Sequence, residues 1–350
     1  MDVSRTTRSA LAAALLLLLP LAGCAGHDSS SPPGAAELSS TRTHTQSREN
    51  NATRYVLAIS VDALNAHALD RLGRSGAPNF HRLMTQGADT LNARTELERT
   101  LTLPNHTGML TGRRVSKASG GHGVDFNHDN HRTVQQNAGH PVASVFQVVH
   151  KRDRSTALFA SKSKFAMFQR SWPRSIDRFM IATDNRRLVT AVRGDLVRHR
   201  RAFTFVHLSH PDDVGHAKGF MTTPYLRAVR DTDRRLGELL RTADRHPVLR
   251  DHLTIVLTSD HGGAGRGHGD ASDFTNYRVP FIVWGAGVRP GARLYDLNDD
   301  FASPGFSRPT YRPVRQPIRN GDVANLSLSL LRMPAVPGSE HDRSQTLVVR

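Results

Sequence analysis

Residues 254–263 read TIVLTSDHGG, an apolar and β-branched run that ends abruptly in an acid, a histidine and two glycines. The run predicts a buried strand of a parallel sheet, because such strands are hydrophobic throughout rather than alternating. Open α/β sheets carry their chemistry at the carboxyl ends of the strands, so Asp260 and His261 are expected at a strand tip. A carboxylate beside an imidazole suits zinc and related divalent metals. The alternative is an ordinary turn, in which the aspartate caps a helix and the histidine is solvated.

Strands of this kind alternate with helical segments along the chain. We expect strands at residues 55–61, 157–160, 203–208, 254–259 and 279–284. Apolar spacing and start and stop residues predict helices at 65–86 (broken near Pro78), 104–110, 141–151, 186–199, 222–244 and 323–331. Pro280 indicates an edge strand or a strand start, and residues 286–320 are expected to form a loop. The alternation predicts one doubly wound, mostly parallel α/β sheet flanked by helices, in a single compact domain.

Other apolar runs also end in residues that can bind metal. Asp62 follows the first strand, HPDDVGH (210–216) follows the third, and GRGHG (265–269) comes shortly after the opening stretch. The topology would bring three carboxylates and three imidazoles to one edge of the sheet. These residues are Asp62, Asp212, Asp260, His216, His261 and His268. A lone aspartate or histidine would be read as a cap or a surface residue, but four clusters at one edge favour a metal site. Gly262 and Gly263 would let the backbone approach a bound group closely.

A nucleophile is suggested by RTLTLPNH, residues 99–106, where Thr102 comes two residues before Pro104, the expected first residue of a helix. A hydroxyl at this place faces the positive end of the helix dipole, where anions are favoured. Threonine attacks poorly at neutral pH unless a base or a metal activates it, and metal is the available route here. The alternative is that Thr102 merely caps the helix.

These motifs together resemble the alkaline phosphatase superfamily, and within it the nucleotide pyrophosphatase/phosphodiesterase family. The resemblance is carried in order by Asp62, TLPNH (102–106), Asp-x-x-Gly-His ending at His216, SDHG (259–262) and His268-Gly269, between about residues 54 and 335. It implies an alkaline-phosphatase-like catalytic domain over residues 54–350.

The resemblance also implies roles for individual residues. One zinc ion would be surrounded by Asp62, Thr102, Asp260 and His261. The second would be held by Asp212, His216 and His268, although the neighbouring Asp213 is an alternative ligand. Thr102 would be the nucleophile. Asn127 would help to hold a phosphoryl oxygen, unless it is only a turn residue.

Several further features of the sequence bear on the family pattern. The family usually has an aromatic residue after the nucleophile, and Leu103 stands there instead, which weakens the case for a nucleotide substrate. Lys162 and Lys164 follow a strand and could touch a substrate anion, but exposed lysines are the favoured interpretation. His268 comes only seven residues after His261, where the family often has a long insertion. This indicates a compact member of the family with little of a cap over its site.

The N-terminus predicts export. Arg5 and Arg8 precede the apolar residues 10–19, and the stretch ends in LAGC (21–24), so residues 1–24 have the pattern of a signal peptide. The ending resembles a bacterial lipobox, whose Cys24 would be lipidated; an ordinary cleaved signal is the alternative. Cys24 is the only cysteine, which excludes an intrachain disulfide. Residues 25–53 are expected to form a flexible linker. We therefore expect an extracytoplasmic protein, secreted or anchored to a bacterial membrane.

The charge gives little further information about partners. The 350 residues include 47 Lys+Arg and 31 Asp+Glu, for a formal net charge of +16. Such a balance attracts polyanions, but the arginines are scattered and form no binding module. We therefore infer no specific nucleic-acid partner, and expect a small-molecule phosphate ester as substrate and the membrane as a contact through the lipid anchor.

The function implied by the resemblance is metal-dependent hydrolysis of phosphate esters. Thr102 would attack phosphorus in line, and the resulting phosphothreonine would be hydrolysed, with two divalent ions, zinc by preference, as cofactors. The charges of two such ions, three carboxylates and a Thr102 alkoxide nearly cancel, which favours a phosphodiester over a monoester. The alternatives are a phosphomonoesterase on the same site and a non-catalytic envelope protein that binds polyanions. A sulfatase is disfavoured, because sulfatases of this superfamily use a modified Cys or Ser in a Cys/Ser-x-Pro-x-Arg setting.

Overall fold

The computed structural model describes residues 52–350. In it, the apolar run that begins the stretch 254–263 forms an interior strand of an eight-stranded sheet. The strand order is β4-β3-β5-β1-β6-β7-β2-β8. Only β7 runs antiparallel to its neighbours, β6 and β2. The expected doubly wound, mostly parallel sheet is therefore confirmed. The strands are β1 (Tyr55–Val61), β2 (Ala88–Arg94), β3 (Thr156–Ala160), β4 (Arg178–Ile181), β5 (Phe203–Leu208), β6 (Leu253–Thr258), β7 (Arg278–Gly285) and β8 (Ala292–Arg293).

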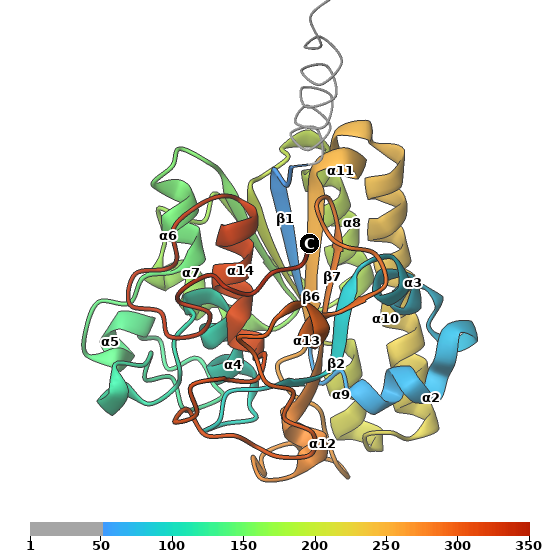
Figure 1. Ribbon diagram of the computed structural model, residues 1–350, viewed down its shortest axis with the longest axis horizontal. Coiled ribbons are helices and arrows are strands. Elements are labelled where there is room, and N and C mark those ends of the chain that lie inside the picture. Colours follow the sequence, from blue (N-terminus) through green and yellow to red (C-terminus); the bar gives the residue numbers. More distant parts are fainter. Residues whose placement is uncertain (1–51) are drawn as a thin grey trace, which may run out of the picture. The chain divides into compact units, whose positions relative to one another are not determined.

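Helices cover both faces of this sheet (Figure 1). The helices are α2 (Ala66–Gly76), α3 (Pro78–Gln86), α4 (Thr102–Thr111), α5 (Val134–Ala138), α6 (Val145–His150), α7 (Ala166–Ser171), α8 (Asn185–Arg198), α9 (His210–Lys218), α10 (Thr223–Arg245), α11 (Pro247–His252), α12 (Phe274–Tyr277), α13 (Leu294–Leu297) and α14 (Val323–Leu330). One face packs against α4, α6, α7 and α14, and the other against α2, α3, α8 and α10.

The central strands are apolar on both sides because each side faces a hydrophobic core. In β1, Val56 and Ala58 belong to one core, whereas Leu57, Ile59 and Val61 belong to the other. Full burial of a large aliphatic side chain contributes about 1.5–3 kcal/mol, so alternating polar residues would be costly here. The apolar run stops where the covering layers end, and the polar residues that follow meet at the carboxyl edge of the sheet.

Strands β2, β4 and β8 were not predicted. Strand β2 has the sequence ADTLNAR, which lacks a clear alternation and has Thr90 as its single β-branched residue, so it carries little of the signal that marks a strand. It forms because β7 on one side and β8 on the other satisfy its backbone. Within the expected loop at 286–320, β8, α13 and a short 3-10 helix, Asn320–Asp322, are also ordered elements.

Pro280 lies in an interior strand, so the expectation of an edge strand is wrong. Strand β7 pairs with β6 and with β2, and the register against β2 shifts between Thr90 and Ala93. This irregularity in β2 lies opposite Pro280, between the pairs Thr90–Phe281 and Ala93–Val279. Proline is tolerated inside sheets at such bulges because no ladder hydrogen bond is required of it.

Helix α4 begins earlier than Pro104, at Thr102 itself, and ends at Gly112 as expected, with a left-handed φ of 64°. Leu101 occupies the N-cap position and makes no side-chain capping bond. Thr102 is therefore the first helical residue, and its hydroxyl makes no hydrogen bond to any described residue. The structure does not show the capping role that was the alternative for this residue.

The signal peptide, Cys24 and most of the expected linker lie outside the described residues. Of the linker, Thr53 is described and is buried: its Oγ1 is 2.8 Å from Thr254 Oγ1 and donates to Ala286 O at 3.0 Å. Packed structure thus begins slightly before the expected boundary. Across residues 52–350, no helix has the length and hydropathy needed to cross a bilayer.

The glycine pair after β6 serves the packing of the chain itself. Gly262 N donates to Asn276 O at 2.8 Å and Gly263 N to Thr275 O at 3.1 Å. A Cβ on Gly262 would lie 1.9 Å from Thr275 O. The two glycines were expected to let the backbone come close to a bound group. In the structure they let it come close to Thr275 and Asn276, in the segment before β7.

We expect Gly262→Ala to lower the free energy of unfolding by about 1–3 kcal/mol, because backbone must move to admit the methyl group. Gly267→Ala is the matched control in the same turn, where an added Cβ meets nothing within 4 Å. This variant should remain within about 0.5 kcal/mol of the parent. Urea unfolding of both variants measures the difference, and equal stabilities would contradict the packing role of Gly262.

Candidate metal centre

The first cluster joins the ends of β1 and β6. Asp62, Asp260 and His261 are completely buried and could hold one ion between them. His261 Nε2 lies 3.4 Å from Asp62 Oδ1 and 3.2 Å from Asp260 Oδ2. Ligands about 2.0–2.1 Å from a tetrahedral zinc ion are about 3.3 Å from one another, so this spacing fits a shared ion.

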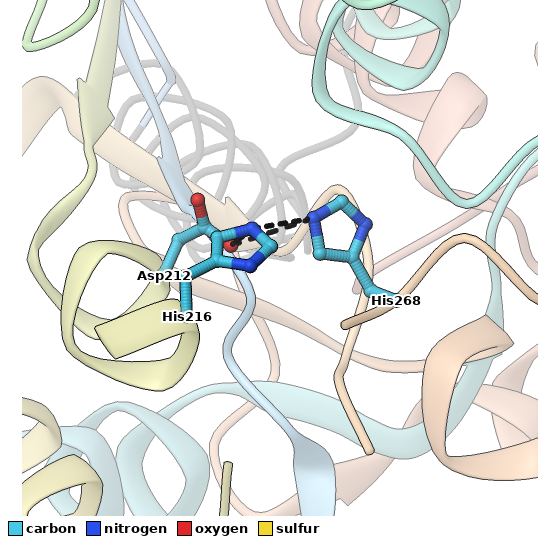
Figure 2. Close-up of side chains that lie close together, drawn as sticks. All are labelled: Asp212, His216 and His268. Atoms are coloured by element: carbon cyan, nitrogen blue, oxygen red, sulfur yellow. Dashed lines mark hydrogen bonds and ion pairs between the residues drawn. The ribbon is translucent and has the colours of Figure 1, made fainter. Parts of the chain in front are cut away.

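The second cluster joins α9 to the loop after β6 (Figure 2). Asp212 and His216 are one helical turn apart on α9, so their side chains share a face. Asp212 Oδ1 is 3.4 Å from His216 Nε2 and 3.6 Å from His268 Nε2. The two Nε2 atoms lie 3.1 Å apart. The two groupings match those that the resemblance implied, and Asp213 is turned to Ser209 Oγ instead, at 2.7 Å.

Backbone carbonyls fix the orientation of all three imidazoles. His261 Nδ1 is 2.9 Å from Gly262 O, His216 Nδ1 is 2.9 Å from Arg266 O, and His268 Nδ1 is 2.6 Å from Thr100 O. A carbonyl oxygen can only accept, so each Nδ1 carries the proton and each Nε2 presents a lone pair. This is the usual arrangement of metal-binding histidines.

Four buried atoms of the two clusters, and the hydroxyl oxygen of Thr102 at the start of α4, have no hydrogen-bond partner in the described part of the chain. Asp62 Oδ1, Asp212 Oδ1, Asp260 Oδ2, His261 Nε2 and Thr102 Oγ1 are buried and make no hydrogen bond among the described residues. Buried polar atoms of this kind are costly and therefore rare. In the second cluster, the two Nε2 lone pairs would repel each other without a cation between them. The donor set therefore fits two divalent ions.

Burial also prepares the imidazoles for metal. It lowers the pKa of His261 to about 4 and that of His268 to about 3. Both rings are therefore neutral near pH 7, the form that binds metal. Burial raises the pKa of Asp260 well above its usual range, and the nearby Asp62 carboxylate acts in the same direction. A cation at this position would oppose both effects.

Two residues that were not predicted as metal ligands contact Oδ2 of Asp62, the oxygen that does not face the first cluster. His207 Nε2, in β5, is 2.9 Å from Asp62 Oδ2, and its Nδ1 is 3.1 Å from Ser161 Oγ. Lys162 Nζ donates to Asp62 Oδ2 and Asp212 Oδ2, both at 2.5 Å. Burial alone would raise the pKa of Asp62, but Lys162 and His207 hold it well below its usual range.

The expectation that Lys162 is an exposed lysine is therefore wrong: only 17% of its side chain is exposed. Each of its two aspartate partners directs one oxygen to the lysine and the other toward a metal cluster. Lys164 is partly buried, and its Nζ donates to Asn127 Oδ1 at 3.0 Å.

Thr102 is held close to the first cluster through its own helix. His106 Nδ1 lies 2.7 Å from Thr102 O and 3.6 Å from Asp260 Oδ2, while its Nε2 is 2.8 Å from Ser60 Oγ. Asn127 Oδ1 accepts from Leu103 N at 3.1 Å. Asn127 is thus fixed to the first turn of α4 next to Thr102.

A pair of buried amides connects this helix to the metal-facing end of β6. Asn320 Nδ2 donates to Asn105 Oδ1 at 3.0 Å, Ser259 O at 3.1 Å and Asp260 O at 3.2 Å. Asn105 Oδ1 also accepts from Glu96 N at 2.9 Å. Asn105 belongs to the TLPNH motif (102–106), but no role was predicted for it. The sequence around Asn320 does not mark this residue as part of a site. Only the folded chain shows that the two amides position the site.

The comparisons with solved structures agree with this fold. Murine ectonucleotide pyrophosphatase/phosphodiesterase 5, as an inactive Thr-to-Ala variant in complex with AMP, superposes with a TM-score of 0.61 at 13% identity, over 84% of this chain and 99% of that chain. The human protein gives a TM-score of 0.59 at 14% identity, over 83% and 99% of the two chains. At these identities the similarity shows a shared fold.

Sequence relatives give a second comparison. GPI ethanolamine phosphate transferase 1 of Gibberella zeae is 30% identical over 156 residues, which are 44% of this chain and 15% of that protein. The Mus musculus protein of the same name is 28% identical over 163 residues, 45% of this chain and 16% of its own length. The chain thus spans about a sixth of the length of these relatives.

The profile described as type I phosphodiesterase/nucleotide pyrophosphatase matches residues 56–270, more than half of the chain. This span runs from β1 to just beyond His268, so it includes both clusters, Thr102 and Asn127. The chain belongs to the type I phosphodiesterase/nucleotide pyrophosphatase family.

Proposed function

We propose that this protein is a metal-dependent phosphoester hydrolase of the phosphodiesterase type, with Thr102 as its nucleophile. The observation that carries the proposal is the set of buried, partnerless atoms in the two clusters, together with the partnerless hydroxyl of Thr102, whose helix contacts Asp260 through His106. The murine relative that is inactive as a Thr-to-Ala variant supports the assignment of a threonine nucleophile.

Two divalent ions, held by Asp62, Asp260 and His261 and by Asp212, His216 and His268, would lower the pKa of a hydroxyl and stabilise a leaving oxygen. At the first turn of α4, Thr102 Oγ would attack phosphorus as the bond to the leaving oxygen breaks, giving a phosphothreonine. Lys164 and the amide of Asn127 would hold a phosphoryl oxygen beside it. Water would then cleave the phosphothreonine and restore the hydroxyl.

The charge of the site favours an anionic ester. Three carboxylates and a Thr102 alkoxide balance the charge of two divalent ions, so Lys162 leaves the site with one positive charge. A phosphodiester carries one negative charge and would neutralise it. If Lys164 also contributes, a dianionic monoester is accommodated, which keeps a phosphomonoesterase as the second candidate. Parallel assays of bis-p-nitrophenyl phosphate and p-nitrophenyl phosphate separate the two.

The relatives named as transferases raise a related question, because a phosphothreonine can be resolved by an alcohol as well as by water. Phosphorus NMR of products formed in the presence of a competing alcohol answers it. Inorganic phosphate or a free phosphate monoester as the main product supports hydrolysis. A new phosphodiester that incorporates the alcohol as the main product would make the protein a transferase.

We expect His207→Ala to weaken zinc binding by about 10- to 100-fold, because Asp62 loses the hydrogen bond that fixes its orientation. His199→Ala is the control, since His199 is exposed at the end of α8. Titration calorimetry measures the affinity, and circular dichroism verifies that both variants are folded. Unchanged zinc affinity in folded His207→Ala would remove the positioning role of His207.

A further inference from the structure

The two most exposed large hydrophobic side chains of the described residues lie in one loop. Phe306 is 84% exposed and Val314 is 100% exposed, compared with 46% for Val348 and 38% for Val248. Isolated exposed apolar residues are common on proteins. An almost fully exposed phenylalanine eight residues from a fully exposed valine is a feature that needs an explanation.

The backbone around Phe306 is held firmly, so the exposure of this side chain is built into the fold. Gly305 O accepts from Arg94 Nη2 at 2.7 Å and from Asn92 Nδ2 at 3.0 Å. The hydroxyl of Tyr277 donates to Phe306 O at 3.0 Å. The ring of Phe306 lies beside that of Phe274, with centroids 5.3 Å apart, and its remaining surface faces outward.

Arginines surround these two apolar side chains. The chain from Phe301 to Gly321 contains no acidic residue, and Arg312, Pro313, Val314 and Arg315 are four consecutive exposed residues. Of the acids nearby, Asp270 and Glu98 both face the loop at Arg308, and the hydroxyl of Tyr311 donates to Glu96 Oε2 at 2.7 Å and to Glu98 Oε2 at 3.0 Å. Arg315 Nη2 donates to Phe301 O at 3.0 Å, close in sequence to the exposed Asp299 and Asp300, but neither Arg312 nor Arg315 forms an ion pair with a described acid. We call Phe306, Arg312, Val314 and Arg315 the rim patch.

The loop that carries the rim patch lies at the edge of the sheet where the candidate metal centre is built. Ser307 O accepts from Nε of Arg94, the last residue of β2, at 3.0 Å. The hydroxyl of Tyr311 accepts from Leu97 N at 3.0 Å, in the segment that leads to Thr102. Figure 1 shows this loop beside α12, at the end of the molecule toward which β1 and β6 run.

We propose that the rim patch binds the surface of an anionic lipid bilayer. Phe306 and Val314 enter the interfacial layer, while Arg312 and Arg315 contact lipid phosphates. Apolar tips flanked by cations match such an interface, where apolar burial and attraction to anionic headgroups act together. The separation of the two tips by polar chain fits a soft lipid layer better than a protein partner, which requires a contiguous apolar area.

A fluorophore in the loop tests the proposal directly. The full-length chain with Cys24→Ser and Phe306→Cys is labelled with the environment-sensitive dye NBD and mixed with phosphatidylglycerol/phosphatidylcholine vesicles. We expect a blue-shifted, brighter emission that doxyl-labelled lipids quench. The matched control carries Val248→Cys in α11, just before β6 begins, and its emission should not change. An unchanged emission at position 306 on saturating vesicles would overturn the proposal.

The arginines are tested in the same labelled chain. Each basic residue near an anionic surface contributes roughly a fivefold gain in affinity, so Arg312→Gln with Arg315→Gln should raise the lipid concentration for half-maximal response about thirtyfold. Pure phosphatidylcholine vesicles should give no response. An equal response with and without phosphatidylglycerol, or a response to single-stranded oligonucleotide but not to vesicles, would refute an anionic lipid surface as the partner.

Discussion

Thr102→Ala is expected to reduce phosphoester turnover by roughly a thousandfold or more while the protein keeps its bound metal. The hydroxyl of Thr102 is buried and makes no hydrogen bond to any described residue. The next residue is held in place, because Leu103 N donates to Asn127 Oδ1. The variant therefore breaks no hydrogen bond, and its main effect should be on reaction rate rather than on stability. Turnover of the better of the two p-nitrophenyl substrates and the metal content by mass spectrometry give the two readings.

Two variants control this experiment. Thr102→Ser keeps a hydroxyl and should retain part of the activity. Thr107→Ala removes a buried hydroxyl from the same helix, where it donates to Leu103 O at 2.7 Å, and should leave turnover almost unchanged. Wild-type turnover by Thr102→Ala would exclude this residue as the nucleophile, and an equal loss in Thr107→Ala would point to damage of helix α4 instead.

Removal of the metal is expected to have an equally large effect. Dialysis against a chelator should abolish turnover, and zinc should restore it at about two ions per chain. Asp260→Asn should lower that number toward one, because the first cluster loses an anionic ligand whose Oδ2 lies 3.2 Å from His261 Nε2. The measurement is metal content after dialysis, together with turnover during zinc addition.

Asp213→Asn is the matched control for the loss of an aspartate. Asp213 is adjacent to Asp212 but is bonded to Ser209 Oγ and belongs to neither cluster. Its replacement should leave the metal content unchanged. Active protein that contains no divalent ion would reject the two-metal hypothesis, whereas a lower content in Asp213→Asn would reject the assignment of the second cluster.

The fold was predictable because its central strands carry their signal locally. Strands β1, β5 and β6 are mostly apolar runs with a core on each side, and each is followed by polar residues that have no place in a core. Their positions after these strands predicted that the six acids and imidazoles gather at one edge, and the resemblance to the family implied their division into two groups, which lie together in the structure. Strand β2 lacks such a signal, because its backbone pairing, and not its side chains, makes it a strand.

The residues that support the site could not be found in this way. His207 stands inside a buried strand, and nothing local shows that its ring reaches Asp62 across the sheet. Asn320 acts on Asn105 and on the end of β6 from a loop far along the chain. Lys162 looked like a surface lysine because its burial depends on two aspartates that come from different strand ends. Contacts of this range become visible only when the topology is known.

Lys162 has a consequence for how the protein matures. Burying unpaired carboxylates is strongly unfavourable, yet this pocket encloses Asp62 and Asp212 with an internal counter-ion already between them. Lys162 would therefore let the sheet assemble around these two carboxylates before an ion is bound.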